Sequence, residues 1–108
     1  MKKISILGST GSIGLSTLEI VRKHPDRFKV VGLAGGSRVE ELAKQASEFK
    51  PLVVSVKAEG DIQKLRGFPG MEKIEILSGT SGAAAVASLR EADLVISAIV
   101  GAAGLLPT

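Results

Sequence analysis

The segment Lys3–Gly14, KISILGSTGSIG, decides the fold that we predict for this chain. Residues 4–7 predict a buried strand, and three regularly spaced glycines follow before a helical pattern begins. We expect Gly8 to turn the chain off the strand, Gly11 to let the backbone approach a pyrophosphate, and Gly14 to let the helix pack close to the sheet. Free N–H groups at such a helix start bind phosphate, so the segment predicts a dinucleotide site.

The glycine spacing is G-x-x-G-x-x-G, which differs from the G-x-G-x-x-G typical of dinucleotide-binding proteins. The strand before it and the helical pattern after it favour the same function, because phosphate binds where a strand turns into a helix start. We expect the hydroxyl groups of Ser9, Thr10 and Ser12 to add direct hydrogen bonds to a ligand. A purely structural glycine turn is the alternative, whereas a P-loop is excluded because G-x-x-x-x-G-K-[ST] is absent.

The rest of the chain alternates between strand and helix patterns. The expected strands are 4–7, 28–33, 52–56, 74–77 and 94–100, and the expected helices are 12–23, 39–49, 61–66 and 83–90. We place 74–77 at a sheet edge beside 52–56, and we pair 94–100, whose apolar composition is typical of a central strand, with the first strand. These elements predict an α/β fold: a Rossmann-like, doubly wound, mostly parallel five-stranded sheet with the strand order 4-3-2-1-5.

The second informative segment is Ala34–Arg38, AGGSR, at the end of the predicted second strand. In dinucleotide-binding folds an acidic residue here binds the 2′-hydroxyl of NAD, and an arginine accepts the 2′-phosphate of NADP. No acidic residue is present, and Ser37 and Arg38 offer a hydroxyl and a guanidinium to a phosphate, while Arg38 is also able to stack on adenine. A charged hydrogen bond of about 1.5–3 kcal/mol corresponds to a roughly ten- to hundredfold preference for NADP(H). The alternative is that Arg38 is a solvated charge near a helix start.

Three further features have a structural interpretation beside a functional one. The segment Ser78–Gly82 precedes the predicted helix 83–90 and suits either an anion site or, more commonly, an N-cap. Asp93 lies at the end of its strand opposite the glycine turn, so we expect a structural role. His24 is the one histidine of the chain and ends the first helix. We expect it to interact favourably with the helix dipole there and not to serve as a proton-transfer group.

Length and composition limit the function classes. The 108 residues suit one domain, and the net charge of +3 is spread along the chain, which argues against a nucleic-acid surface. The absence of cysteine excludes a disulfide, a thiolate metal site and a cysteine nucleophile, and the absence of tyrosine excludes the catalytic tyrosine of short-chain dehydrogenases. No apolar run has the length of a membrane span and no signal peptide is recognised, so we expect a cytoplasmic protein without a membrane or nucleic-acid partner.

With these segments in view, the whole chain resembles the amino-terminal part of the 1-deoxy-D-xylulose-5-phosphate reductoisomerase family. The segments that carry the resemblance are 6–28, 33–42, 77–82 and 98–108, and the most specific are ILGSTGSIGLSTLEIVRKHPDRF and AIVGAAGLLPT. The family is NADPH-dependent, so the resemblance implies three groups of cofactor-binding residues. These are Thr10, Gly11, Ser12 and Ile13 at the pyrophosphate, Gly36, Ser37 and Arg38 at the 2′-phosphate, and Ala98, Ile99, Val100 and Gly101 at the nicotinamide. Some members have Lys and Asn where this chain has Ser37 and Arg38, so the positive charge is shifted by one residue.

The resemblance also implies what the whole enzyme does. Members convert 1-deoxy-D-xylulose 5-phosphate into 2-C-methyl-D-erythritol 4-phosphate in the non-mevalonate route to isoprenoid precursors, with NADPH and Mg²⁺ or Mn²⁺, and they form homodimers. Their metal-binding and substrate-phosphate-binding residues lie later in the sequence, so we expect no catalytic or metal-binding residue within 1–108. We expect a shortened chain that forms one NADPH-binding domain and binds the cofactor without catalysis. A stand-alone dinucleotide-sensing module and a structural α/β domain without a ligand are the alternatives.

Overall fold

The computed structural model describes residues 2–36 and 38–97 of the chain. Strands and helices alternate throughout this part. The elements are β1 (Lys2–Leu7), α1 (Ser12–Lys23), β2 (Phe28–Ala34), α2 (Val39–Phe49), β3 (Val53–Val56), α3 (Asp61–Arg66), β4 (Glu75–Ser78), α4 (Gly79–Ala87) and β5 (Leu94–Ser97). The helices α1, α2 and α3 have the bounds that the sequence predicted, because glycine, proline and the helical period mark their ends locally.

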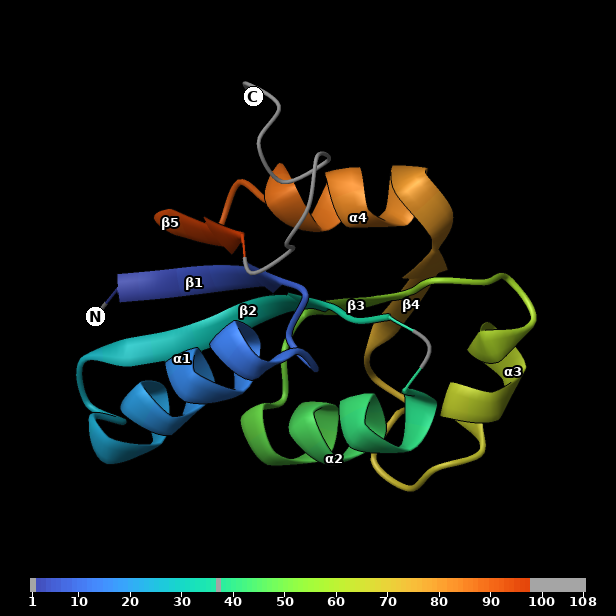
Figure 1. Cartoon of the computed structure of the whole chain (residues 1–108), viewed down its shortest axis with the longest axis horizontal. Coiled ribbons are helices and arrows are strands. Elements are labelled where there is room, and N and C mark those ends of the chain that lie inside the picture. The colour runs from blue at the N-terminus through green and yellow to red at the C-terminus, as the bar shows by residue number, and fades with distance from the viewer. Residues whose placement is uncertain (1, 37, 98–108) are drawn as a thin grey trace.

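The five strands form one sheet in the order β4-β3-β2-β1-β5, and every neighbouring pair is parallel. Parallel neighbours need crossover connections, and helices supply them here. Helices α1 and α2 lie on one face of the sheet and α4 lies on the other (Figure 1). The predicted Rossmann-like, doubly wound α/β architecture and its strand order are therefore confirmed. The turn after β1 and the segment after β2 leave the sheet at the same edge, formed by the carboxyl ends of the strands.

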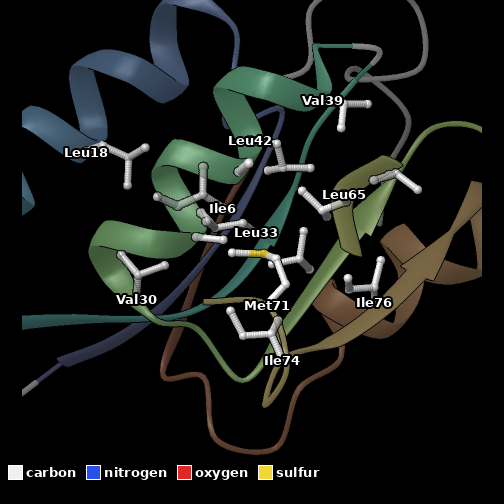
Figure 2. Close-up of a cluster of buried hydrophobic side chains, with 14 of the residues drawn as sticks. Ile6, Leu18, Val30, Leu33, Val39, Leu42, Leu65, Met71, Ile74 and Ile76 are labelled. Carbon is white, nitrogen blue, oxygen red and sulfur yellow. The ribbon is translucent and has the colours of Figure 1, made fainter. Parts of the chain in front are cut away.

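The larger hydrophobic core lies between the sheet and the helices α1, α2 and α3 (Figure 2). Ile6, Leu33 and Val54, from three neighbouring strands, have no exposed surface. Leu42 of α2 and Leu65 of α3 belong to the same cluster and are equally buried. Full burial of a side chain of this size contributes about 1.5–3 kcal/mol, so this core holds the helices in fixed positions against the strands that carry the candidate site.

Helix α4 begins and ends earlier than the helix at 83–90 that the sequence predicted. Gly79 has a φ of +70°, so the chain turns from β4 into the helix without an intervening loop. Gly82 lies directly against Ser55 and Leu77, and an ideal β-carbon on Gly82 would be only 3.1 Å from Leu77 Cβ. The contact with the sheet therefore decides where this helix begins, and local propensity does not.

Strand β5 lies at the edge of the described sheet rather than in its centre. Leu94 and Val95 are 45% and 40% exposed, so the central position expected from the apolar composition is wrong for the part of the chain that the structure describes. The composition of a strand shows how apolar it is, but it does not show whether the strand has neighbours on one side or on both. The Asp93 carboxylate accepts from the Lys3 N–H at 2.9 Å, and the Asp93 N–H donates to the Lys3 carbonyl at 2.7 Å, so its predicted structural role is confirmed.

Two predicted helix ends have different outcomes. His24 is the C-cap residue of α1, and its N–H donates to the Val21 carbonyl at 3.0 Å, which confirms its place at the end of the helix. Ser78 occupies the N-cap position of α4 without a capping hydrogen bond from its side chain. Thr80 and Ser81 lie within α4 instead of in a loop before it. The loop 78–82 that the sequence analysis considered as an anion site is therefore not formed.

Candidate functional site

The turn after β1 is held against the end of β2. Gly8 has a φ of +79°, a conformation that strongly favours glycine, as predicted. The N–H groups of Gly8 and Ser9 both donate to the Ala34 carbonyl, at 2.7 and 3.1 Å, and the Gly11 N–H donates to the Gly8 carbonyl at 3.1 Å. These bonds give the turn a defined position at the carboxyl edge of the sheet.

Helix α1 begins with backbone N–H donors for which the described part of the chain offers no backbone acceptor. Gly11 is the N-cap residue, and no side chain caps the helix. Within the described ranges, the N–H groups of Thr10, Ser12 and Ile13 have no backbone acceptor outside the helix, and no acidic residue lies in the first turn. These donors and the positive end of the helix dipole together attract an anion.

Two glycines of the turn are there for different reasons. An ideal β-carbon on Gly14 would lie 2.6 Å from Ser9 Cα and 2.8 Å from Ser9 C, closer than real β-carbons come. The helix does pack closely at Gly14, but its partner is the backbone of the turn after β1 rather than the sheet that the sequence analysis expected. A β-carbon on Gly11 would meet only the Gly8 carbonyl oxygen among the described atoms, at an ordinary 3.5 Å. Contacts within the described residues therefore do not require glycine at this position, and they leave space beside it for a ligand.

A groove of about 440 Å³ joins the two segments that the sequence analysis singled out. Its lining residues come from the turn, from α1 and from the segment between β2 and α2: Thr10, Gly11, Ser12, Leu15, Gly36 and Arg38. Arg38 is exposed and is the N-cap residue of α2. The structure therefore brings a permanent positive charge to the same groove as the free N–H groups of α1.

The remaining predicted residues have other positions. Ile13 lies in the first turn of α1, where its side chain is 50% exposed and does not line the groove. Ser37 and the nicotinamide group Ala98, Ile99, Val100 and Gly101 lie outside the described residues, so their roles stay predictions. The described part of β5 ends at Ser97, which pairs with Leu7 directly before the glycine turn.

The hydroxyl of Ser9 does not face the groove. Ser9 is 0% exposed, and its Oγ has no hydrogen-bond partner among the described residues, so the expectation that this hydroxyl binds a ligand is wrong. Ser9 is held inward because its carbonyl accepts a hydrogen bond from Gln45 Nε2 at 2.9 Å. Gln45 is a residue of the site that sequence reasoning missed. It follows Leu42 by one helical turn and precedes Ala46, so a polar residue on the apolar face of α2 is the signal that marks it.

An ion pair joins the two helices that border the groove, at their other ends. Arg22, in the last turn of α1, donates to Glu48 of α2 through Nε and, at 2.7 Å, through Nη2. This hydrogen bond lowers the pKa of the Glu48 carboxyl below its ordinary value. The Arg22 guanidinium also lies over the ring of Phe49, 5.3 Å from its centroid. Both charged side chains are partly exposed, so the pair contributes only about 0.5 kcal/mol and serves mainly to orient α1 relative to α2.

Arg38 also borders a larger hollow of about 720 Å³, which lies over α2 and α3. Glu40, Glu41 and Lys44 are among its lining residues. Lys64 lines it too, so the hollow combines three cationic side chains with two carboxylates, whereas the lining of the groove at the glycine turn contains Arg38 and no carboxylate.

The described residues contain no group of three or more His, Cys, Asp or Glu side chains arranged to hold a metal ion. Among the same residues, no helix combines the length and the apolar character needed to cross a membrane.

A parallel sheet with a glycine turn and a free helix start at the carboxyl ends of its strands defines the class of Rossmann-like nucleotide-binding domains. Within that class, the family model of 1-deoxy-D-xylulose 5-phosphate reductoisomerase matches residues 4–108. The chain therefore belongs to the 1-deoxy-D-xylulose 5-phosphate reductoisomerase family, and the resemblance predicted from its sequence is confirmed.

Individual relatives agree with this assignment. The chain is 59% identical to the 1-deoxy-D-xylulose 5-phosphate reductoisomerase of Chlorobaculum tepidum and 56% identical to that of Pelodictyon phaeoclathratiforme, in each case over all of this chain and 28% of the relative. A solved DOX-P reductoisomerase in complex with NADPH, fosmidomycin and magnesium has 42% identity and a TM-score of 0.87 over 97% of this chain and 26% of that chain. The Zymomonas mobilis enzyme in complex with NADPH has 28% identity and a TM-score of 0.85 over 95% of this chain and 27% of its own. The chain thus spans little more than a quarter of the length of these relatives.

Proposed function

We propose that residues 1–108 form the NADPH-binding domain of a 1-deoxy-D-xylulose 5-phosphate reductoisomerase. The observation that carries the proposal is the groove in which the free N–H groups at the start of α1 lie together with Arg38. Two of the solved relatives are complexes with NADPH, and this chain has the same fold as both. A dinucleotide presents two anionic groups at different points, and the groove has a positive feature for each.

The start of α1 receives the pyrophosphate in this proposal. Thr10, Ser12 and Ile13 provide the N–H donors, and Thr10 and Ser12 also provide hydroxyl groups. The Gly11 N–H is bonded to the Gly8 carbonyl, so Gly11 contributes space for the ligand rather than a donor. The open space beside Gly11 lets the pyrophosphate approach the backbone closely. Since no acidic side chain lies in the first turn of α1, nothing there repels the negative charge.

The 2′-phosphate of the adenosine lies against Gly36, Ser37 and Arg38 in this proposal. Arg38 provides a positive charge, and no acidic residue lies between β2 and α2 to bind the free 2′-hydroxyl of NAD. We place the phosphate in the groove rather than in the larger hollow because the groove joins Arg38 to the start of α1 and has no carboxylate in its lining. A charged hydrogen bond from Arg38 is worth about 1.5–3 kcal/mol, a roughly ten- to hundredfold preference for NADPH over NADH.

The nicotinamide lies beside the segment 98–101 in this proposal. The pairing of Ser97 with Leu7 supports this placement, because Leu7 directly precedes the glycine turn. Bound NADPH supplies the hydride that reduces the rearranged substrate. The part of the chain described here binds and orients this donor, and it offers no ligand set for a metal.

The whole protein, in this proposal, converts 1-deoxy-D-xylulose 5-phosphate into 2-C-methyl-D-erythritol 4-phosphate in the non-mevalonate route to isoprenoid precursors. The substrate phosphate and the Mg²⁺ or Mn²⁺ ion are held by residues other than 1–108, so this chain alone binds NADPH without catalysis. The homodimer of the family and a cytoplasmic location complete the proposal.

Calorimetric titration with NADPH and, separately, with NADH tests the assignment. We expect saturable binding of NADPH, weakened at least about tenfold by Arg38→Ala, with little change for NADH. Lys44→Ala is the matched control, because Lys44 lines the larger hollow and not the groove, and it should change NADPH affinity by less than about twofold. A larger loss with Lys44→Ala than with Arg38→Ala would move the 2′-phosphate into the hollow. No saturable binding of either cofactor would refute the proposal for this chain.

A further inference from the structure

The buried face of α2 contains a polar side chain that contacts the glycine turn. Gln45 is only 4% exposed, and its Nε2 donates to the Ser9 carbonyl at 2.9 Å. A carbonyl oxygen only accepts, so this bond also determines which way the Gln45 amide points. We propose that Gln45 is a positioning residue for the cofactor, which holds the peptide between Ser9 and Thr10 so that the Thr10 N–H faces the pyrophosphate. The inference rests on the proposed NADPH function.

The planarity of the peptide bond connects Gln45 to the groove. No cis peptide occurs among the described residues, and in a trans peptide the N–H and the C=O point in opposite directions. The Ser9 carbonyl points inward to Gln45, so the Thr10 N–H of the same peptide points away from α2 and toward the groove that Thr10 lines. Because this N–H has no backbone acceptor within the described chain, it is free to bind a ligand.

Loss of the Gln45 donor changes this arrangement without any change at the ligand itself. Ser9 is fully buried, so its carbonyl has no access to water in place of Gln45. A buried carbonyl without a partner is strongly unfavourable, and rotation of the peptide toward water relieves it. The same rotation carries the Thr10 N–H out of the groove.

Packing alone does not explain a glutamine at this position. Leu42 and Ala46, its neighbours on the buried face of α2, are apolar, and an apolar side chain of similar length would fill the same volume. The Gln45 Oε1 atom is buried without a partner among the described residues, and burial of such an oxygen is energetically unfavourable. An amide is therefore expected at this position only if the hydrogen bond donated by its nitrogen has a role. The hydrogen bond to Ser9 is what the amide contributes.

The same bond links the two phosphate-binding parts of the groove. Arg38 is the N-cap residue of α2, and Gln45 lies about 10 Å further along this helix. The hydrogen bond from Gln45 to Ser9 therefore connects the helix that carries Arg38 directly to the turn that receives the pyrophosphate.

The test compares Gln45→Met, which keeps the length of the side chain and removes the donor, with Ala43→Gly in the same helix. Ala43 is buried beside Phe68 and Pro69 rather than at the turn, so glycine there loosens α2 and leaves the bond to Ser9 in place. NADPH and adenosine 2′-monophosphate are titrated into the unmodified chain and both variants, by calorimetry and, for the weaker nucleotide, by NMR. Adenosine 2′-monophosphate has the 2′-phosphate and no pyrophosphate, so it reports general damage around Arg38.

We expect Gln45→Met to weaken NADPH binding about tenfold and to change the binding of adenosine 2′-monophosphate by less than about twofold. Ala43→Gly should change neither by more than about twofold. If Gln45→Met does not fold, Gln45→Asn, whose amide is one methylene too short to reach Ser9, should give the same pattern. NADPH affinity within about twofold of the unmodified chain, or an equal loss for both nucleotides, overturns the positioning role and leaves the proposed function intact. Absence of saturable NADPH binding to the unmodified chain overturns the proposed function, and the inference with it.

Discussion

Replacement of Gly14 by alanine measures how tightly α1 lies on the glycine turn. An ideal β-carbon at this position would be 2.6 Å from Ser9 Cα and 2.8 Å from Ser9 C. Ser9 cannot easily move away, because its N–H is bonded to Ala34 and its carbonyl is bonded to Gln45. The added methyl group therefore has to push the start of α1 away from the turn.

The size of the effect follows from two opposing contributions. Extra volume in a packed site costs about 1–3 kcal/mol, and a backbone partner that is fixed by hydrogen bonds places the cost near the upper value. Alanine recovers about 1 kcal/mol relative to glycine inside a helix. We expect Gly14→Ala to lower the free energy of unfolding by about 2 kcal/mol and the Tm by about 8 °C.

Urea and thermal unfolding followed by circular dichroism measure this loss. Gly60→Ala is the matched control, since among the described residues only its chain neighbours lie within 4 Å of an ideal β-carbon there, and its φ of −61° suits alanine. We expect the control to leave stability unchanged or to raise it by about 0.4–1 kcal/mol. Equal stability of Gly14→Ala and the unmodified chain would refute the reasoning, because α1 would then not be in contact with the backbone of the turn.

Three further predictions concern the site and the elements that hold it. Gly11→Ala should lower the free energy of unfolding by no more than about 1 kcal/mol, since its β-carbon has only ordinary contacts and alanine is a poorer N-cap residue than glycine. The same variant should weaken NADPH binding about tenfold in calorimetry, and unchanged affinity would place the pyrophosphate elsewhere. Glu48→Gln should cost about 0.5 kcal/mol at neutral pH, because the charge that Arg22 stabilises is lost. The lowered pKa of Glu48 makes this contribution fully present above its ordinary value of 4.5 and removes it as the pH falls through the lowered value, so urea unfolding of variant and unmodified chain should converge in acid; a gap independent of pH would contradict this. Asp93→Ala should remove the acceptor of the Lys3 N–H, cost about 1 kcal/mol and speed hydrogen exchange at the Lys3 amide, and an unchanged exchange rate would show that the carboxylate does not hold β1 to β5.

The sequence alone predicted most elements and the two segments that form the groove. Glycine and proline set the ends of α1, α2 and α3, and the helical period identifies their buried faces, because these signals act within a few residues of the chain. The approach of Arg38 to the glycine turn was predictable for a different reason. In a parallel sheet the segments that follow neighbouring strands leave at the same edge, so the strand order by itself brings the two together.

The tertiary structure decided the features that depend on contacts between distant segments. The start of α4 is set by the approach of Gly82 to Ser55, and no local pattern in the chain encodes that contact. The inward orientation of Ser9 and the role of Gln45 arise from a hydrogen bond between residues 36 positions apart, which only the packing of α2 on the sheet creates. Local propensity therefore determined which elements form, whereas packing determined which polar groups face the ligand and which are turned into the protein.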